Sequence, residues 1–180
     1  MTEQTDSFRR TRLKDGREVL LRLQNRDDFD RSLEFFRRLP DGERLFMRRN
    51  VTQRDVLAER FEEVAGGLST VIVAEAAGLI VADALLYVQP QGWFRKTGEV
   101  RLYVDPAWRG VGLGSTMVRE VFALAVRKGL KKLEAALMGS QEGTIELVEK
   151  LGFVREGALE GFVVDSRGRE HDLVLMGLAL

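Results

Sequence analysis

The chain has no cysteine among its 180 residues. It therefore offers no disulfide bond, no thiolate metal site and no cysteine nucleophile. A single histidine, His171, makes a histidine-rich zinc site unexpected, and we expect no bound metal. Net charge is missing as well: 28 basic and 28 acidic residues cancel to +0. We therefore expect neither nucleic acid nor a membrane as a partner.

Long apolar runs are also absent from the sequence. No stretch is long enough to span a bilayer, and the polar, acidic segment 1–6 does not resemble a signal peptide. We therefore expect a cytoplasmic protein. A chain of this length supports one domain with a substantial core. We predict a disordered tail over residues 1–8 and a single domain over residues 9–180.

The hydrophobic pattern predicts an ordered succession of strands and helices. Apolar, β-branched runs indicate strands, and apolar residues at helical spacing indicate helices. A first strand follows an Asp15-Gly16 turn. The expected strands cover residues 18–23, 69–75, 79–89, 99–104, 132–137, 153–162 and 169–178, and the expected helices cover residues 29–39, 42–47, 52–64, 115–128 and 142–151. This order is typical of an α/β (α+β) domain with a mixed, mostly antiparallel sheet.

A glycine-rich segment joins one expected strand to the next expected helix. Its sequence is Arg109-Gly110-Val111-Gly112-Leu113-Gly114-Ser115, and the helix begins at its last residue. A glycine-rich turn that opens a helix presents unpaired backbone N–H groups at the positive end of the helix dipole. Such a turn binds anions, and the expected anion is a phosphate or pyrophosphate.

Three phosphate-binding patterns compete for this segment. A P-loop requires a lysine before Ser or Thr, and the segment has no lysine. A dinucleotide-binding turn requires Gly-x-Gly-x-x-Gly and an acidic residue at the end of the next strand, whereas the spacing here is Gly-x-Gly-x-Gly and Glu134 stands in mid-strand. The third pattern is Arg-x-x-Gly-x-Gly, filled by Arg109, Gly112 and Gly114. A tight turn without a ligand is the remaining alternative.

The third pattern resembles the acetyl-CoA-binding motif of the GNAT N-acetyltransferase family, here running from Val104 to Gly114. A second match lies downstream, where Leu147-Val148-Glu149-Lys150-Leu151-Gly152-Phe153 looks like the later helix–strand motif of that family. The resemblance covers residues 13–180 and is strongest over residues 99–157. It implies a GNAT-like sheet whose splayed strands form the cofactor cleft, with acetyl-CoA as co-substrate.

The resemblance also implies which residues hold acetyl-CoA. The pyrophosphate would rest on backbone N–H groups of the glycine-rich segment, helped by the hydroxyl of Ser115 or Thr116. The pantetheine arm would pair with the backbone of the preceding strand, like an added strand, and would accept a hydrogen bond from Gln141. The expected cofactor-binding residues are Leu102, Tyr103, Val104, Arg109, Gly110, Val111, Gly112, Leu113, Gly114, Ser115 and Gln141.

Two residues are expected to carry the chemistry. Glu99 stands where several family members carry a general base, and Glu75 and Glu134 are weaker candidates. The usual proton donor to the leaving thiolate is a tyrosine, and Val148 occupies that position here. Tyr103 is the expected replacement donor, with Ser140 or water as alternatives.

The resemblance implies an acetyl-CoA-dependent N-acetyltransferase in which a primary amine attacks directly in a ternary complex. The start of the chain, residues 13–22, is similar to domains that acetylate protein lysines, and small amines stay open as acceptors. A homodimer is possible, since dimers are common in the family. The missing tyrosine favours one alternative, a non-catalytic acyl-CoA-binding or sensor module. The basic pairs Arg37-Arg38 and Arg48-Arg49 are interpreted as solvent-exposed charge, with binding of an acidic acceptor as the alternative.

Overall fold

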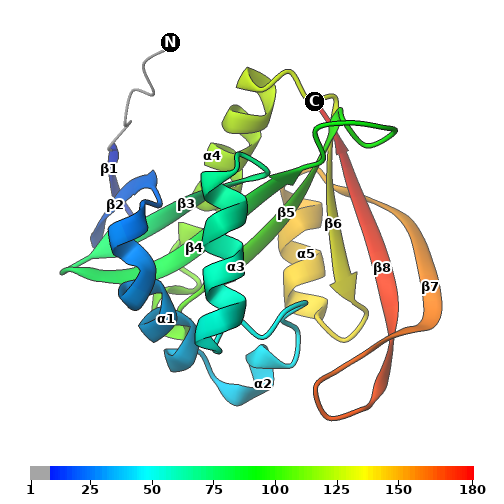
Figure 1. The fold of residues 1–180 in the computed structure, drawn as a ribbon, viewed down its shortest axis with the longest axis horizontal. Helices are drawn as coiled ribbons and strands as arrows, with labels where there is room; N and C mark the ends of the chain where they lie inside the picture. The colour runs from blue at the N-terminus through cyan, green and yellow to red at the C-terminus, as the bar shows by residue number, and fades with distance from the viewer. Residues whose placement is uncertain (1–8) are drawn as a thin grey trace.

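One eight-stranded sheet organises the molecule (Figure 1). The computed structural model describes residues 9–180, and the tail expected over residues 1–8 lies outside them. The strands are β1 (Arg9–Arg12), β2 (Glu18–Leu23), β3 (Ser69–Ala76), β4 (Leu79–Val88), β5 (Thr97–Val104), β6 (Lys132–Met138), β7 (Val154–Val164) and β8 (Glu170–Ala179). Their spatial order is β1-β2-β3-β4-β5-β6-β8-β7, and only β5 and β6 run parallel. The predicted mixed, mostly antiparallel α+β sheet is confirmed.

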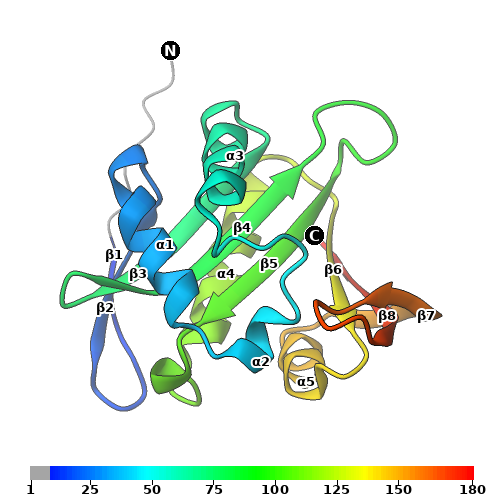
Figure 2. The same cartoon turned by 60° about the horizontal axis from the view of Figure 1, so that its bottom comes forward.

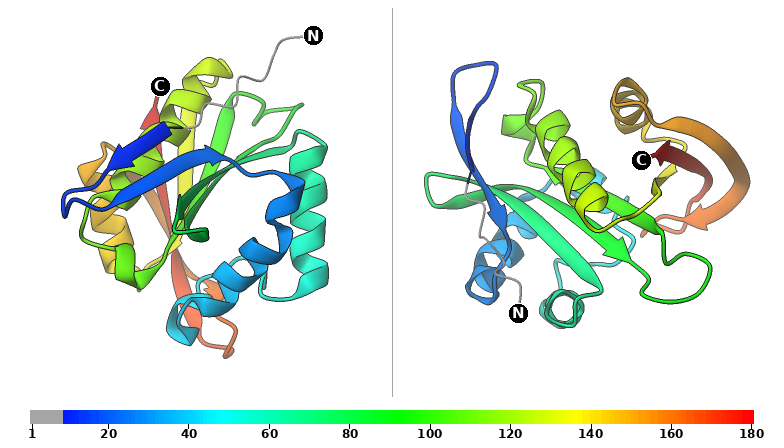
Figure 3. Two further views of the ribbon diagram at one scale, coloured as in Figure 1. Left: turned by 90° about the vertical axis from the view of Figure 1, so that its left-hand side faces the viewer. Right: turned by 90° about the horizontal axis from the view of Figure 1, so that it is seen from above.

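Helices cover both faces of this sheet. They are α1 (Phe29–Arg38), α2 (Asp41–Arg44), α3 (Arg54–Ala65), α4 (Leu113–Arg127) and α5 (Glu142–Lys150), with short 3-10 turns η1 (Arg26–Asp28) and η2 (Pro106–Trp108). Figure 3 shows α1 and α3 on one face and α4 on the other. None of the helices within residues 9–180 is long and apolar enough to cross a membrane.

Each face has its own hydrophobic core, because strand side chains alternate between the two sides. Val100 of β5 packs with α4, which buries Leu113, Met117 and Val121 against the sheet. On the opposite face, Phe36 of α1 and the other apolar residues of α1 and α3 pack against β3 and β4. Residues of β5 with even numbers therefore face α4, and those with odd numbers face α1 and α3.

The parallel pair β5–β6 separates soon after it forms. Their pairing is limited to Thr97–Glu99 against Lys132–Glu134. A Cβ atom at Gly98 would lie 2.6 Å from a methyl of Leu86, so only glycine allows this close approach. Beyond Glu99, β5 stays paired with β4 as far as Val104, whereas β6 pairs with β8. The strands therefore diverge and leave one backbone edge of β5 unpaired (Figure 2).

A buried ion-pair network ties β2 to the start of α1. The Arg22 guanidinium donates to both oxygens of Asp28 at 2.6 Å and to Glu75 at 2.8 Å. Asp28 is only 1% exposed. Burial would raise the pKa of Asp28, but hydrogen bonds from Arg22 and from the Asn25 N–H outweigh it and hold that pKa below its usual value. The folded state therefore favours the ionised carboxylate.

We expect Asp28→Asn to destabilise the fold by about 3–5 kcal/mol, because it leaves the Arg22 charge without its main partner. In the native protein, the lowered pKa stabilises the fold above the ordinary Asp value of 3.8, and this stability is lost as pH falls through the lower folded value. The melting temperature should therefore drop on acidification below about pH 4 and drop less in the variant. Asp30→Asn is the control, since Asp30 pairs with Arg54 on the surface. Equal melting temperatures for the two variants would contradict the prediction.

Candidate active site

A deep cleft opens where β5 and β6 separate. Its volume is about 710 Å³, which is within the usual range for small-molecule sites. It extends from the N-terminus of α4 and the side of α5 to the segment that follows α2. The lining residues are Lys14, Glu43, Phe46, Leu102, Tyr103, Val104, Arg109, Gly110, Gly112, Gly114, Ser115, Gln141, Gly143, Thr144, Leu147 and Lys150.

The glycine-rich segment forms one end of this cleft. Gly112 is the N-cap of α4 with φ of +90°, a left-handed conformation that glycine adopts without strain. Within residues 9–180 no side chain caps the helix, so its first N–H groups are open to a ligand. Ser115 lines the cleft, whereas the Thr116 hydroxyl donates to the Gly112 carbonyl at 3.0 Å. Of the two hydroxyls considered, Ser115 is therefore the one available.

Two members of the predicted segment contribute only backbone here. Leu113 is fully buried in the core on the α4 face. Val111 packs against the same core, and its carbonyl accepts a hydrogen bond from the Lys14 N–H at 3.1 Å. Their side chains do not line the cleft, so any contact with a ligand would come from their amides.

Sequence reasoning missed two cations at the cleft. Lys14, from the turn between β1 and β2, lies against the loop, with its side-chain carbons 3.5 to 3.6 Å from where a Cβ of Gly112 would stand. Lys150 reaches the cleft from the end of α5. Only the folded chain brings these lysines to the glycine-rich segment, although their charge beside a phosphate site is expected chemistry.

Arg109 is less free than its motif position suggests. Its guanidinium forms an ion pair with Glu43 and donates to the Val104 carbonyl from Nε at 3.1 Å and from Nη2 at 2.7 Å. This side chain joins the loop to the end of β5 and to α2. The Val104 carbonyl therefore already accepts hydrogen bonds from Arg109. A pantetheine arm along β5 would have to pair with the neighbouring backbone groups instead.

Gln141 stands at the N-terminus of α5 and faces the cleft. Its Oε1 accepts a hydrogen bond from the Met138 N–H at 2.9 Å, which leaves its amide nitrogen to donate to a ligand.

Ser140, the alternative proton donor, is 3.1 Å from His171 Nδ1, and His171 Nε2 is 3.1 Å from Asp165 Oδ2. Ser140 and His171 do not line the cleft, so this hydrogen-bonded chain joins the β7–β8 hairpin to the loop before α5.

Glu99 lies at the point where β5 and β6 begin to diverge. Its Oε1 is 2.7 Å from Arg48 Nη1 and 2.6 Å from Arg101 Nε, and its side chain is 11% exposed. Glu134 is its register partner on β6. Burial, followed by repulsion from Glu99, raises the pKa of Glu134. Arginines thus flank Glu99, and Arg48 pairs with it although its side chain remains 41% exposed.

Tyr103 occupies the centre of the site. It lines the cleft, the small cavity of about 70 Å³ between β5 and β6, and a further cavity on the α3 side. Its ring contacts Phe36 edge-to-face at 5.4 Å between centroids. Burial raises the pKa of the phenol above its ordinary value, so Tyr103 stays protonated and can donate a proton. Val148, where the family's tyrosine would stand, is buried.

The family model described as "Acetyltransferase (GNAT) family" matches residues 21–153, which span most of the sheet and the whole glycine-rich segment. The chain belongs to the GNAT acetyltransferase family. This confirms the resemblance that the Arg-x-x-Gly-x-Gly segment carries. Among residues 9–180 there is no group of three or more His, Asp or Glu side chains placed to hold a metal ion.

Two curated GNAT relatives match about half of the chain. A Bacillus subtilis protein, named provisionally as a phosphinothricin acetyltransferase, is 34% identical over 48% of this chain and 53% of its own length. Glucosamine 6-phosphate N-acetyltransferase of Trypanosoma brucei brucei is 33% identical over 49% of this chain and 60% of its own length. The matches thus span little more than half of these relatives. Both names refer to small molecules, which does not support the expected closeness to protein-lysine acetyltransferases.

A solved structure supports the fold over nearly the whole described range. The GNAT phosphinothricin acetyltransferase of Sinorhizobium meliloti, in complex with acetyl-CoA, superposes with a TM-score of 0.77 and 22% identity. The match covers 90% of this chain and 88% of that one. At this identity, the similarity shows the fold alone.

Proposed function

We propose that this GNAT protein is an acetyl-CoA-dependent N-acetyltransferase that transfers an acetyl group to a primary amine by direct attack in a ternary complex. One observation carries the proposal: the uncapped N-terminus of α4 opens onto a cleft that continues into the gap between β5 and β6. A phosphate at the helix N-terminus and an extended arm along the free edge of β5 both fit this arrangement.

The residues present fit acetyl-CoA. Gly112 and Gly114 let a pyrophosphate approach the free amides of α4, and Lys14 adds a positive charge beside them. The Gln141 amide and the backbone of Leu102 and Tyr103 would hold the pantetheine arm. Acetyl-CoA supplies the thioester, and the protein supplies orientation, proton transfer and backbone donors toward the carbonyl.

We assign the base to Glu99 and the proton donor to Tyr103. Glu99 would accept the proton of the ammonium group, directly or through water, and its Oε2 is the oxygen not held by the two arginines. Tyr103 would donate its hydroxyl proton toward the leaving sulfur, because burial keeps the phenol protonated, although the raised pKa makes it a weaker acid. Because a CoA thiol is acidic, its thiolate can leave without immediate protonation. The proton-donor role of Tyr103 is therefore less demanding than the base role of Glu99.

A small-molecule amine is the acceptor class that we favour. The curated relatives are named for phosphinothricin and for glucosamine 6-phosphate, and protein lysine is kept as the second class. A homodimer stays a prediction, for which the outer strand β7 offers the exposed apolar side chains of Val154, Phe162 and Val164.

Calorimetric titration with acetyl-CoA, CoA and NAD tests the proposal, followed by a thiol-release assay over a panel of amines and lysine peptides. We expect CoA and acetyl-CoA to bind, NAD not to bind, and one amine class to release the thiol. CoA binding without thiol release from any acceptor would favour the non-catalytic sensor module. A chain that binds no CoA would overturn the assignment.

A further inference from the structure

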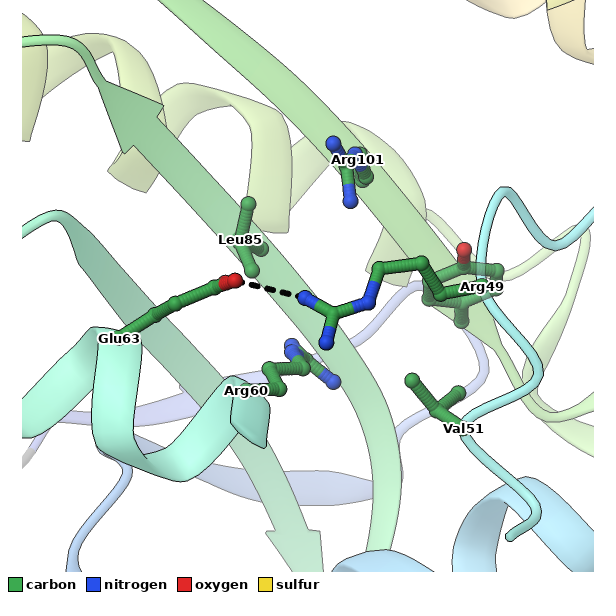
Figure 4. A pocket seen from close by; sticks show the side chains of 7 residues that line it. Arg49, Val51, Arg60, Glu63, Leu85 and Arg101 are labelled. Carbon is green, nitrogen blue, oxygen red and sulfur yellow. Dashed lines mark hydrogen bonds and ion pairs between the residues drawn. The ribbon is translucent and has the colours of Figure 1, made fainter. Parts of the chain in front are cut away.

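A third and still smaller cavity lies on the face of the sheet that α1 and α3 cover. Figure 4 shows it with the guanidinium groups of Arg49, Arg60 and Arg101 turned toward one space beside Leu85. Val51, Glu63 and Tyr103 complete the lining. Three arginines come from three separate elements, namely the segment before α3, α3 itself and β5. Like charges repel, so gathering them around one space is costly unless negative charge balances them.

Arg60 is the most informative of the three arginines. Its side chain is about nine-tenths buried or more, with the residue 5% exposed. Nη2 donates to Asp83 Oδ1 at 2.6 Å, but Nη1 is buried and has no hydrogen-bond partner among the described residues. A buried charged nitrogen without a partner costs free energy, and native proteins rarely leave one so. A ligand atom that accepts a hydrogen bond in this cavity would remove that cost.

The surrounding carboxylates pair with all three arginines but accept hydrogen bonds from only some of their N–H groups. Arg49 is held by Glu63 at 2.6 Å and by Glu59 at 2.5 Å. Arg101 is different, because the only hydrogen bond of its guanidinium within residues 9–180 runs from Nε to Glu99. Its two terminal nitrogens remain as donors toward the cavity.

The remaining balancing group is Asp83, behind Arg60. Burial raises the pKa of Asp83, and the Arg60 charge opposes this. Its Oδ2 has no hydrogen-bond partner within residues 9–180. Water could occupy the cavity and accept from Arg60, but it brings no charge. An oxyanion accepts hydrogen bonds from the free N–H groups of Arg60 and Arg101 together, and charge-assisted hydrogen bonds of this kind are stronger than those that water accepts.

The cavity adjoins the proposed reaction site. Arg101 and Tyr103 line the arginine cavity and also the cavity of about 70 Å³ between β5 and β6. Tyr103 lines the main cleft as well. The volume of the arginine cavity itself is about 20 Å³, which holds roughly one water-sized group. One oxygen of a carboxylate or phosphate fits this space. The rest of such a molecule would lie along Tyr103, toward the separation of the strands.

We propose that the acceptor amine carries an oxyanion, a carboxylate or a phosphate group, which binds in the cavity formed by Arg49, Arg60 and Arg101. This inference rests on the proposed acetyltransferase function and adds the chemical class of its acceptor. The arginines fix the anionic end, and the amine at the other end is thereby directed past Tyr103 to the gap where Glu99 lies. Binding on the α3 face leaves the α4 side of the cleft to the cofactor.

The test measures oxyanion binding and acceptor preference separately. The CoA-loaded protein is titrated with phosphate and with acetate, which distinguishes the two oxyanion sources. Matched acceptors, namely 2-aminoethylphosphonate, β-alanine and the neutral β-alaninamide, are compared in the thiol-release assay. The variants are Arg49→Gln and the double variant Arg60→Gln/Asp83→Asn, which replaces a buried ion pair by a neutral pair and so protects folding. Arg54→Gln on the outer side of α3, where the side chain is 64% exposed, is the matched control.

We expect one of the two anions to bind, and both cavity variants to weaken it by about tenfold or more, the effect of one lost charge-assisted hydrogen bond. The control should bind as the native protein does. Among the matched acceptors, the anionic 2-aminoethylphosphonate and β-alanine should release thiol faster than the neutral β-alaninamide. This difference in rate should disappear in the cavity variants. Absence of anion binding, or unchanged binding in the variants, would overturn the inference. If the native chain fails to bind CoA, the proposed function fails instead, and the anion titration of the free protein still decides the cavity.

Discussion

A Gly112→Asp variant is expected to bind CoA at least about a hundredfold more weakly than the native protein, since losing two charge-assisted hydrogen bonds costs about 3 kcal/mol or more. Gly112 has φ of +90°, which an aspartate adopts only with strain. The new carboxylate would also stand beside Lys14 and could pair with it. The phosphate end of the cofactor would therefore be repelled by the new carboxylate and would lose its attraction to Lys14. Calorimetry measures the effect directly.

Two companion variants separate the causes. Gly112→Ala carries the backbone strain without the charge and should lose about tenfold, the equivalent of 1–2 kcal/mol. Gly92→Asp makes the same chemical change at φ of +78°, in the loop between β4 and β5, where nothing lies within 4 Å of the added Cβ. It should leave CoA affinity unchanged. A folded Gly112→Asp protein that binds CoA as tightly as Gly92→Asp would refute the role of the loop.

The order of strands and helices could be predicted because most of them carry a clear local pattern. The seven expected strands and the helix that follows the glycine-rich turn match their expected bounds to within two residues. β1 was not foreseen, since Arg9-Arg10-Thr11-Arg12 has no apolar alternation and is a strand only through its pairing with β2. The local sequence therefore predicts the central elements and misses an edge that tertiary pairing creates.

The candidate site was only partly predictable for a related reason. The glycine-rich segment is contiguous in sequence, so its pattern reveals it. Lys14, Arg60 and Arg101 are far apart in the chain, and only the sheet and α3 bring such residues to the cleft and to the cavity beside it. The interpretation of Arg48-Arg49 as solvent-exposed charge was incomplete for this reason. Both side chains keep exposed fractions of 41% and 32%, but they also pair with carboxylates, Arg48 with Glu99 and Arg49 with Glu59 and Glu63 of α3.

Glu99→Gln is expected to lower kcat/KM by about a hundredfold or more, the usual contribution of a positioned general base. CoA affinity should not change, because Glu99 is not among the residues that line the cleft. The matched control is Glu134→Gln, the same change at the register partner on β6. It should reduce kcat/KM less, since Glu134 is assigned no contact with the amine. Thiol release with a reacting acceptor, after a CoA titration of each variant, measures both.

The pH dependence of kcat/KM decides between the two carboxylates. If Glu99 is the base, the fall of kcat/KM toward acid pH disappears in Glu99→Gln and persists in Glu134→Gln. If Glu134 is the base, the decrease of kcat/KM toward acid pH persists in Glu99→Gln but moves to lower pH. It moves because removal of the Glu99 charge removes one of the causes that raise the pKa of Glu134, while burial still raises it. If the decrease of kcat/KM toward acid pH disappears only in Glu134→Gln, the general base is Glu134 on β6 and not Glu99 on β5.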